Sequence, residues 1–368
     1  MLKFSRNSIA AKIRLLLLLA FALLACGIYT PTASAGPTYV VGTCKTGLRS
    51  FSTISTALAA IPSPTIVMVC PGSYSEQVII TFPVTLEGIA TSLTDMAVIE
   101  PPSGAFIMAN TLLGVEVAPQ LWVNNVSGPV DITNIAIDGR EADVSGLLAG
   151  IFLQNSSGTI NQVATRNQDT SGFGVWLEGG SANPTVTLED SSIHDFSDVG
   201  IFIEGELTAT AKSNSVNDVS STGIEIESPA KFEVTNNVVV AFASETQGIV
   251  AADGAAGSIS NNTVLNASTG IVAQGGISVT GNKLYNNNTG IQMSGEPIVT
   301  GNTITNSFIA IDFGCADDSN VHSNTISDAT NGIDGVPAGI TTANTFHNVL
   351  SLREACGDVS TAKAKKTN

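Results

Sequence analysis

Three aromatic side chains occupy one position of a sequence repeat that runs through much of this chain. Phe152, Trp176 and Phe202 follow one another at intervals of 24 and 26 residues. Polar side chains recur two positions farther along the same segments and on the next one: Gln154, Glu178, Glu204 and Glu227. Sugar rings have apolar faces and hydroxyl edges, which suit aromatic rings beside carboxylates. We therefore predict that the three aromatics and the three glutamates bind substrate.

Two other interpretations of this aromatic stripe stay open at the level of sequence. An exposed apolar patch on a water-soluble protein also marks a contact with another protein. Alternatively, a loop, with Gly104–Val130 as the candidate, folds over the rings and turns them into a satellite of the core.

A second group of acidic side chains lies near the C-terminal end of the repeats. Asp312 and Asp334 occupy equivalent repeat positions, and Asp317 and Asp318 fall in the adjoining turn. Carboxylates stacked in this way bind Ca²⁺, or one of them acts as an acid with a raised pKa. Asp312, Asp317 and Asp318 are thus catalytic candidates, and together with Asp334 they are a candidate calcium site. A solvated acidic turn is the alternative.

Composition limits the partners and the kind of core. The 368 residues carry a formal net charge of −16, which disfavours nucleic acid and anionic membrane surfaces. Acidic polysaccharide is disfavoured too, unless Ca²⁺ bridges it. Only 5% of residues are aromatic, so the core must be built from Val and Ile, which favours strands.

The repeat itself predicts the fold. Steps of the type Gly-Ile begin at Gly150, Gly174, Gly200, Gly223, Gly248, Gly270, Gly290, Ala310 and Gly332, at intervals of 20 to 26 residues. Segments of the type "NTITN" run alongside, and a third short apolar piece precedes most of them. Each repeat therefore holds three short strands, and stacked copies bury a continuous core.

Two columns of polar residues accompany the strands. One begins at Asn214 and ends at Asn344, where we expect turns with positive φ and amides that hydrogen-bond from coil to coil. The other comprises Asp218, Asn266, Asn286, Asn306, Asp328 and Asn348. We expect both columns to be structural.

Residues 150–348 resemble the right-handed parallel β-helix repeats of the pectin-lyase-like superfamily. The segment "FSTISTALAAIPSPTIVMVCPGSYSEQVIITFPVTLEG" (Phe51–Gly88) resembles the N-terminal cap of pectin methylesterases. Phe51, Ile54, Leu58 and Ile61 share one helical face, with Ser50 as the expected N-cap. The predicted fold class is all-β, a three-stranded parallel solenoid with a short capping helix.

The resemblance does not bring a complete catalytic set with it. Lyases of the superfamily use a basic residue, but Arg166, Lys212, Lys231 and Lys283 fall at different repeat positions. "AIDFGCADD" (Ala310–Asp318) matches the pectin methylesterase strand only in part. The histidines His194, His322 and His347 form no hydrolase motif. The enzyme class therefore stays uncertain.

The termini carry processing and cysteine signals. Residues 1–35 have the pattern of a secretory signal peptide, and "LLAC" resembles a lipobox with an anchor at Cys26. Four further cysteines suggest two disulfides, and proximity favours Cys44–Cys70 and Cys315–Cys356. We expect a cap and first coil over 36–90, the β-helix over 91–350 and a C-terminal cap with a basic tail over 351–368.

Together these features predict a secreted, monomeric protein that binds or processes an extracellular polysaccharide, with Ca²⁺ as the only cofactor considered. A lyase, hydrolase or esterase with carboxylates from different coils is the first alternative. A structural or adhesive surface solenoid is the second.

Overall fold

The structure is a computed structural model that describes residues 37–61, 65–90, 96–140, 142–144, 146–169, 171–242, 245–315, 320–336 and 343–356. The predicted signal peptide, Cys26, Asp317 and Asp318 lie outside the described residues. No helix in these ranges is long and apolar enough to cross a membrane.

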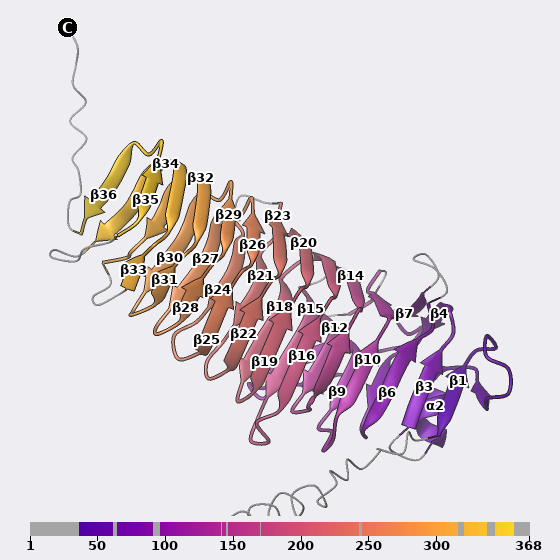
Figure 1. The fold of residues 1–368 in the computed structure, drawn as a ribbon. Coiled ribbons are helices and arrows are strands. Elements are labelled where there is room, and N and C mark those ends of the chain that lie inside the picture. The colour runs from indigo at the N-terminus through magenta and orange to yellow at the C-terminus, as the bar shows by residue number, and fades with distance from the viewer. Residues whose placement is uncertain are drawn as a thin grey trace, which may run out of the picture. The chain divides into compact units, whose positions relative to one another are not determined.

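The strands lie on three faces of a solenoid, and on each face the strands of successive coils pair in parallel. The coils stack from β1, in indigo, to β36, in yellow (Figure 1). The first face is a sheet with the strand order β2 (Ser50–Phe51), β1 (Thr38–Val41), β3 (Thr65–Val69), β6 (Val84–Gly88), β10 (Val130–Thr133), β13 (Gly158–Asn161), β16 (Thr185–Glu189), β19 (Thr208–Lys212), β22 (Lys231–Thr235), β25 (Ala256–Ser260), β28 (Ser278–Thr280), β31 (Ile298–Thr300) and β33 (Asn320–His322).

The other two faces hold the Asn-type and the Gly-Ile segments. The second face runs β4 (Gly72–Ser75), β7 (Ala97–Glu100), β11 (Ile135–Asp138), β14 (Ala164–Gln168), β17 (Ser192–Phe196), β20 (Ser215–Val219), β23 (Val238–Ala241), β26 (Thr263–Leu265), β29 (Lys283–Tyr285), β32 (Thr303–Asp312), β34 (Thr325–Val336) and β35 (Thr345–His347). The third runs β5 (Val78–Ile80), β9 (Glu116–Asn124), β12 (Leu147–Gln154), β15 (Gly172–Gly179), β18 (Val199–Gly205), β21 (Thr222–Ile226), β24 (Gln247–Ala251), β27 (Thr269–Gln274), β30 (Thr289–Ser294), the ends of β32 and β34, and β36 (Ser351–Ala355). The predicted three strands per coil are confirmed.

The core is a column of branched aliphatic residues, as predicted. The inward residues of the Gly-Ile segments are all fully buried: Ile151, Val175, Ile201, Ile224, Ile249, Ile271, Ile291, Ile311 and Ile333. Glycine precedes all of them except Ile311, which follows Ala310, and the coils pack closely at this position. A Cβ on Gly200 would lie only 2.6 Å from the carbonyl oxygen of Gly223 in the next coil.

The first Asn column forms a buried hydrogen-bond ladder. From Asn214 to Asn324, each amide Nδ2 donates to the Oδ1 of the Asn in the next coil, at 2.9 to 3.1 Å. Each backbone N–H donates to the same oxygen at 2.9 Å. The coil-to-coil bonding is thus confirmed and explains why Asn recurs here.

The prediction that the residues of that first column have positive φ is wrong. Left-handed backbone occurs one residue earlier, for example at Asn236 and Asn261, because the buried Asn itself must continue into the strand. The second column does adopt it, with φ between 53° and 62° in all six residues from Asp218 to Asn348.

A short helix, α2 (Ile54–Ala60), lies near the N-terminal end and contacts β1, β2, β3 and β5. Its N-cap is Thr53 rather than the expected Ser50, because the Thr53 hydroxyl accepts from the backbone of Thr56 in a capping box. Phe51 belongs to β2, while Ile54 and Leu58 enter the core. The likeness to the pectin methylesterase cap stays a prediction.

Both expected disulfides are present. Cys44 pairs with Cys70, and Cys315 pairs with Cys356, with Cα atoms 5.7 and 5.4 Å apart. Each bridge ties a turn to a coil near one end of the described solenoid.

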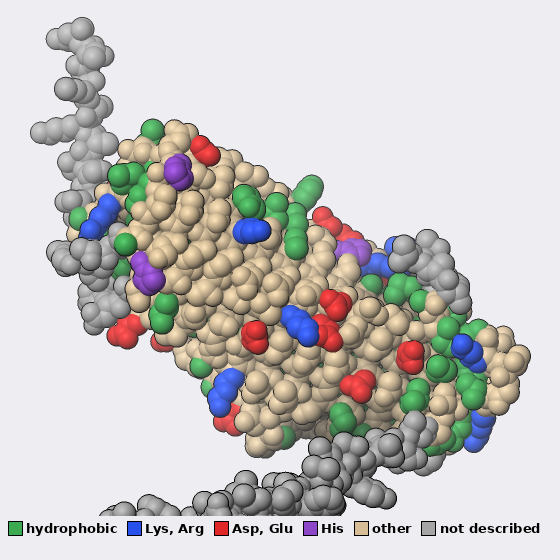
Figure 2. All heavy atoms as spheres, in the orientation of Figure 1, with side chains coloured by type: hydrophobic (Ala, Val, Ile, Leu, Met, Phe, Trp, Pro, Cys, Tyr) green, Lys and Arg blue, Asp and Glu red, His purple; other side chains and the backbone are tan. Residues whose placement is uncertain are grey.

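Charged side chains are sparse on the visible face of the solenoid. Figure 2 shows a surface on which the side chains of Asp, Glu, Lys and Arg are few and scattered. This agrees with the 12% of charged residues in the sequence.

Candidate functional site

The aromatic side chains of the stripe stack in register on the third face. Phe152 pairs with Trp176, and Trp176 with Phe202, as partners in adjacent strands. Their ring centroids lie 5.4 and 5.1 Å apart. The stripe begins one coil earlier than expected, because Trp122 pairs with Phe152. Trp122 was missed because its segment lacks the Gly-Ile step on which the repeat was aligned.

Two of the three predicted rings are not exposed, so the expected open stripe is wrong. Phe152 is fully buried and Trp176 is 4% exposed. Phe173 stacks on Trp176 with ring centroids 4.5 Å apart. Ala109 and Val117 belong to the same buried cluster. Of the predicted rings, only Phe202 keeps part of its surface in solvent.

The cover over the rings is a hairpin formed by β8 (Ala109–Asn110) and the start of β9, which pair antiparallel. It lies within the Gly104–Val130 loop that was the candidate for this role. Gln154 donates from Nε2 to the Asn110 carbonyl oxygen at 2.7 Å. The Leu112 N–H donates to Glu178 Oε1 at 2.5 Å. Polar side chains of the third face therefore fix the hairpin on the stripe.

A cleft lies between the turn of the hairpin, at Leu112 and Leu113, and Phe202 of the stripe. It has a volume of about 640 Å³. Its apolar lining comprises Leu112, Leu113, Phe202 and Pro229, and its carboxylates are Glu178, Glu204, Glu206 and Glu227. Leu113 is 79% exposed at the rim. We call this space the stripe cleft. All three glutamates predicted from the sequence line it.

Two of these carboxylates are buried and linked to the stripe. Glu178 is 1% exposed and Glu204 is 6% exposed. Trp176 donates from Nε1 to Glu204 Oε1 at 2.9 Å, and Gln154 donates to Glu178 Oε2 at 2.8 Å. The buried aromatic residue therefore positions a cleft carboxylate instead of offering its face to a ligand.

The environment makes these acids weak. Burial raises the pKa of Glu204 to about 7; the hydrogen bond from Trp176 opposes the rise, and the charges of Glu178 and Glu227 add to it. Burial also raises the pKa of Glu178. A carboxyl group with a pKa of about 7, like that of Glu204, exchanges a proton near neutral pH.

Glu225 is a further acid beside the cleft that was not predicted. It occupies the stripe position on the coil after Phe202. Burial, together with the charges of Glu227 and Asp198, raises the pKa of Glu225 to about 7. The stripe column changes from aromatic residues to an acidic one after Phe202, and this change in the sequence was the signal that could have identified Glu225.

The acidic group near the C-terminal end is only partly described. Asp312 and Asp334 are partners in β32 and β34, as expected. Asp312 Oδ1 accepts from the Gly314 N–H at 3.0 Å, and Asp334 Oδ1 from the Gly335 N–H at 2.8 Å. A calcium site or an acid here stays a prediction.

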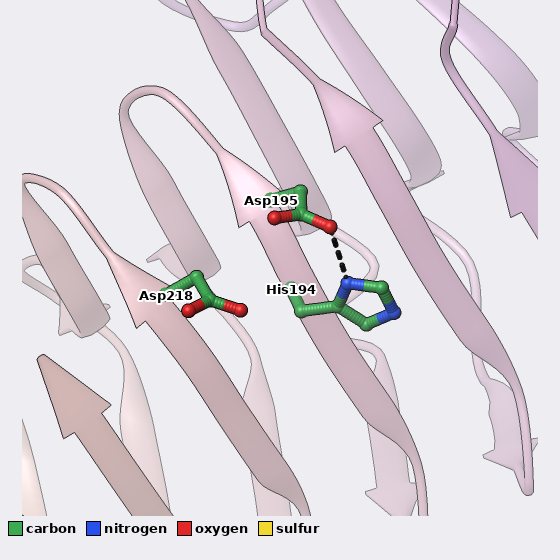
Figure 3. A group of neighbouring side chains, drawn as sticks. All are labelled: His194, Asp195 and Asp218. Carbon is green, nitrogen blue, oxygen red and sulfur yellow. Dashed lines mark hydrogen bonds and ion pairs between the residues drawn. The ribbon is translucent and has the colours of Figure 1, made fainter. Parts of the chain in front are cut away.

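Another group of possible metal ligands lies on the second face. His194 and Asp195 in β17 and Asp218 in β20 have ligand atoms within 4.8 Å of one another. Figure 3 shows both carboxylates on adjacent strands, with His194 Nδ1 2.7 Å from Asp195 Oδ2. In the described part of the chain it is the one group of three such residues this close. Sequence analysis missed it, although Asp195 and Asp218 share a repeat position with positive φ.

Comparison with known proteins identifies the architecture. The family described as "Right handed beta helix region" matches residues 121–277 and 242–366. Among solved structures, the A-module of mannuronan C-5 epimerase AlgE6 from Azotobacter vinelandii is similar at a TM-score of 0.57 and 16% identity, over 83% of this chain and 91% of that one. A DFA-IIIase mutant from Arthrobacter chlorophenolicus A6, in complex with DFA-III, is similar at a TM-score of 0.52 and 14% identity, over 87% and 86%. No curated protein matches the sequence.

Proposed function

The chain belongs to the right-handed β-helix family, and from this premise we propose that it binds a polysaccharide in the stripe cleft. The observation that carries the proposal is the meeting of a partly exposed aromatic ring, Phe202, with several carboxylates in one cleft. Because a fold alone does not define an activity, the site has to supply the argument.

The chemistry of the lining suits a saccharide. Phe202, Leu112 and Pro229 offer apolar surface to the face of a sugar ring. Glu204 and Glu227 offer acceptors to hydroxyl groups at the ring edge, while both oxygens of the buried Glu178 already accept from Leu112 and Gln154. The cleft is open at its rim, and its volume of about 640 Å³ falls within the range of ligand pockets. A mannuronan epimerase shares the fold, which supports the proposal without identifying the sugar.

A second candidate function is an enzyme that acts on the bound polysaccharide. The observation in its favour is the pair Glu204 and Glu225, each with a pKa raised to about 7. A carboxyl group in this range donates or accepts a proton at neutral pH, as general acid–base catalysis requires. Glu204 is the better candidate because it lines the cleft.

We further propose that the protein is exported. Two disulfides are typical of proteins that fold in an oxidising compartment, and a polysaccharide ligand is found there too. Mass spectrometry of the protein from culture medium and cell fractions would locate it and identify its first residue.

The test is a glycan array with product analysis, run on the parent protein and on Phe202→Ala, with and without Ca²⁺. We expect Phe202→Ala to weaken binding by about tenfold, because one stacked ring contributes roughly 1–2 kcal/mol. Phe308→Ala is the matched control, since Phe308 is an exposed aromatic residue outside the cleft.

Each outcome of that test selects one function. Binding without product supports a binding module, and new reducing ends or unsaturated products support the enzyme. If no glycan binds, or if Phe202→Ala and Phe308→Ala bind alike, the stripe cleft is not a saccharide site.

A further inference from the structure

The charge of the stripe cleft has one sign. Four of its lining residues carry carboxylates, and none of the lining residues is Lys, Arg or His. Glu225, the strand partner of Phe202 on the next coil, adds an acidic group beside the cleft, and the charges of Glu227 and Asp198 act on it. The cleft is therefore a concentrated region of negative potential on an already acidic protein.

Two of the cleft carboxylates are buried, which is unusual for charged groups. Glu178 and Glu204 are almost fully buried, and carboxylates that deep in a protein are normally paired with a cation. Their partners here are the Leu112 N–H, Gln154 and Trp176, and the two carboxyl groups also hydrogen-bond one another. In the described ranges, the ion pairs involve Asp138, Asp195 and Glu189, and none involves a cleft glutamate.

From this charge arrangement, and resting on the proposed function, we infer that the ligand is a saccharide chain whose sugars carry free amino groups. An ammonium group supplies the counter-charge that the cleft glutamates lack, and its charged hydrogen bonds are stronger than those of a hydroxyl. The face of Phe202 at the same cleft adds a cation–π contact. Uronate polymers, by contrast, meet like charge throughout the cleft.

Protonation gives this ligand a distinct signature. An ammonium ion beside Glu204 lowers the pKa of that carboxyl from about 7. Binding at pH 6 then releases a proton, whereas binding of a neutral sugar releases none.

The experiment compares three hexamers by calorimetry at pH 6, where amino groups are protonated. Glucosamine hexamer and N-acetylglucosamine hexamer share one sugar backbone and differ in whether each amine is free or acetylated, and galacturonate hexamer carries the opposite charge. We expect the glucosamine hexamer to bind about tenfold or more tighter than its acetylated counterpart, and the galacturonate hexamer not to bind. Repeating the titration in two buffers with different heats of ionisation measures the proton release.

Two charge-removing variants localise the effect. Glu204→Gln should lower the proton release and reduce the preference for the free amine by about tenfold. Glu227→Gln should reduce the preference too, and because Glu227 is only half-buried it serves if Glu204→Gln fails to fold. Glu233→Gln removes the same charge from an exposed position of β22 on the first face and should change nothing.

Different results would overturn the amine preference and the proposed saccharide site. If both glucosamine hexamers bind equally and Phe202→Ala weakens both, the saccharide site stands and the amine preference is wrong. If neither hexamer binds but a lysine-rich peptide does, the cleft is a peptide site and both proposals fall. Equal amine preference in Glu204→Gln, Glu227→Gln and the parent also overturns the inference.

Discussion

Trp176 connects the stacked rings to the acidic cleft. Its indole is packed between Phe152, Phe173 and Phe202, and its N–H donates to Glu204. A residue in this position determines where a carboxylate lies without meeting a ligand itself. Its importance is therefore to stability and to the geometry of Glu204.

We expect Trp176→Ala to destabilise the protein by about 3–5 kcal/mol, because it empties a packed aromatic site and leaves Glu204 without its donor. Urea denaturation measures the loss. Trp176→Phe retains most of the packing and removes only the N–H, so its smaller cost isolates the hydrogen bond. A Trp176→Ala protein as stable as the parent would mean that the ring is not packed as described.

The raised pKa of Glu204 predicts a pH dependence of stability. Between the ordinary value of 4.5 and the folded value of about 7, the folded state keeps a proton that the unfolded state has lost. The free energy of unfolding therefore falls as pH rises through this window, by up to about 1.4 kcal/mol per pH unit for one group, and levels off above pH 7.

Urea denaturation at a series of pH values from 4.5 to 8 tests this, with Glu204→Gln expected to show a shallower fall. Glu225 has a raised pKa as well and should account for part of the remaining slope. A parent protein whose stability rises over this range would contradict the assignment.

The Asn ladder is the element that locks one coil onto the next. Asn302 donates to Asn324 and to the Val279 carbonyl oxygen, and it accepts two bonds from Asn282. All of these groups are buried away from water. Breaking one rung leaves several polar atoms unsatisfied on both sides.

Asn302→Ala should therefore cost about 1–3 kcal/mol or more, measured by thermal or urea denaturation. Asn306→Gly is the control, because Asn306 is exposed and glycine accommodates its φ of 59°. Equal effects of the two changes would argue against a special role for the buried ladder.

The solenoid as a whole is stabilised mainly between neighbouring coils. In such an array, damage at one end spreads only as far as the local interfaces allow. The two disulfides lie where this matters, since each ties a turn to a coil near one end of the described chain.

Replacing Cys315 and Cys356 by serine should cost about 2–5 kcal/mol and loosen the C-terminal coils first. Hydrogen exchange should rise in β34 to β36 and remain unchanged in β12 to β18. Replacing Cys44 and Cys70 is the matched change at the other end. Uniform exchange along the solenoid after either change would show that the disulfides act globally.

The sequence by itself determined the repeating parts of this protein. Coils stacked in register place residues 20 to 26 positions apart side by side, so the aliphatic core, both polar columns and the order of the aromatic stripe were readable from spacing. The disulfide pairs followed from proximity along the chain. The N-cap Thr53 and the φ values of the first Asn column were misplaced, because both depend on local hydrogen bonds, and Trp122 was missed because its segment lacks the Gly-Ile step.

The tertiary structure alone decided which of those surfaces are free. The β8–β9 hairpin departs from the repeat, so no periodicity shows that it covers Phe152 and Trp176 and leaves Phe202 at an open cleft. The raised pKa values of Glu204 and Glu225 were also decided by the tertiary structure, since burial and neighbouring charge are properties of the folded chain. Spacing identified side chains that could do chemistry, and the covering hairpin determined which of them meet a ligand.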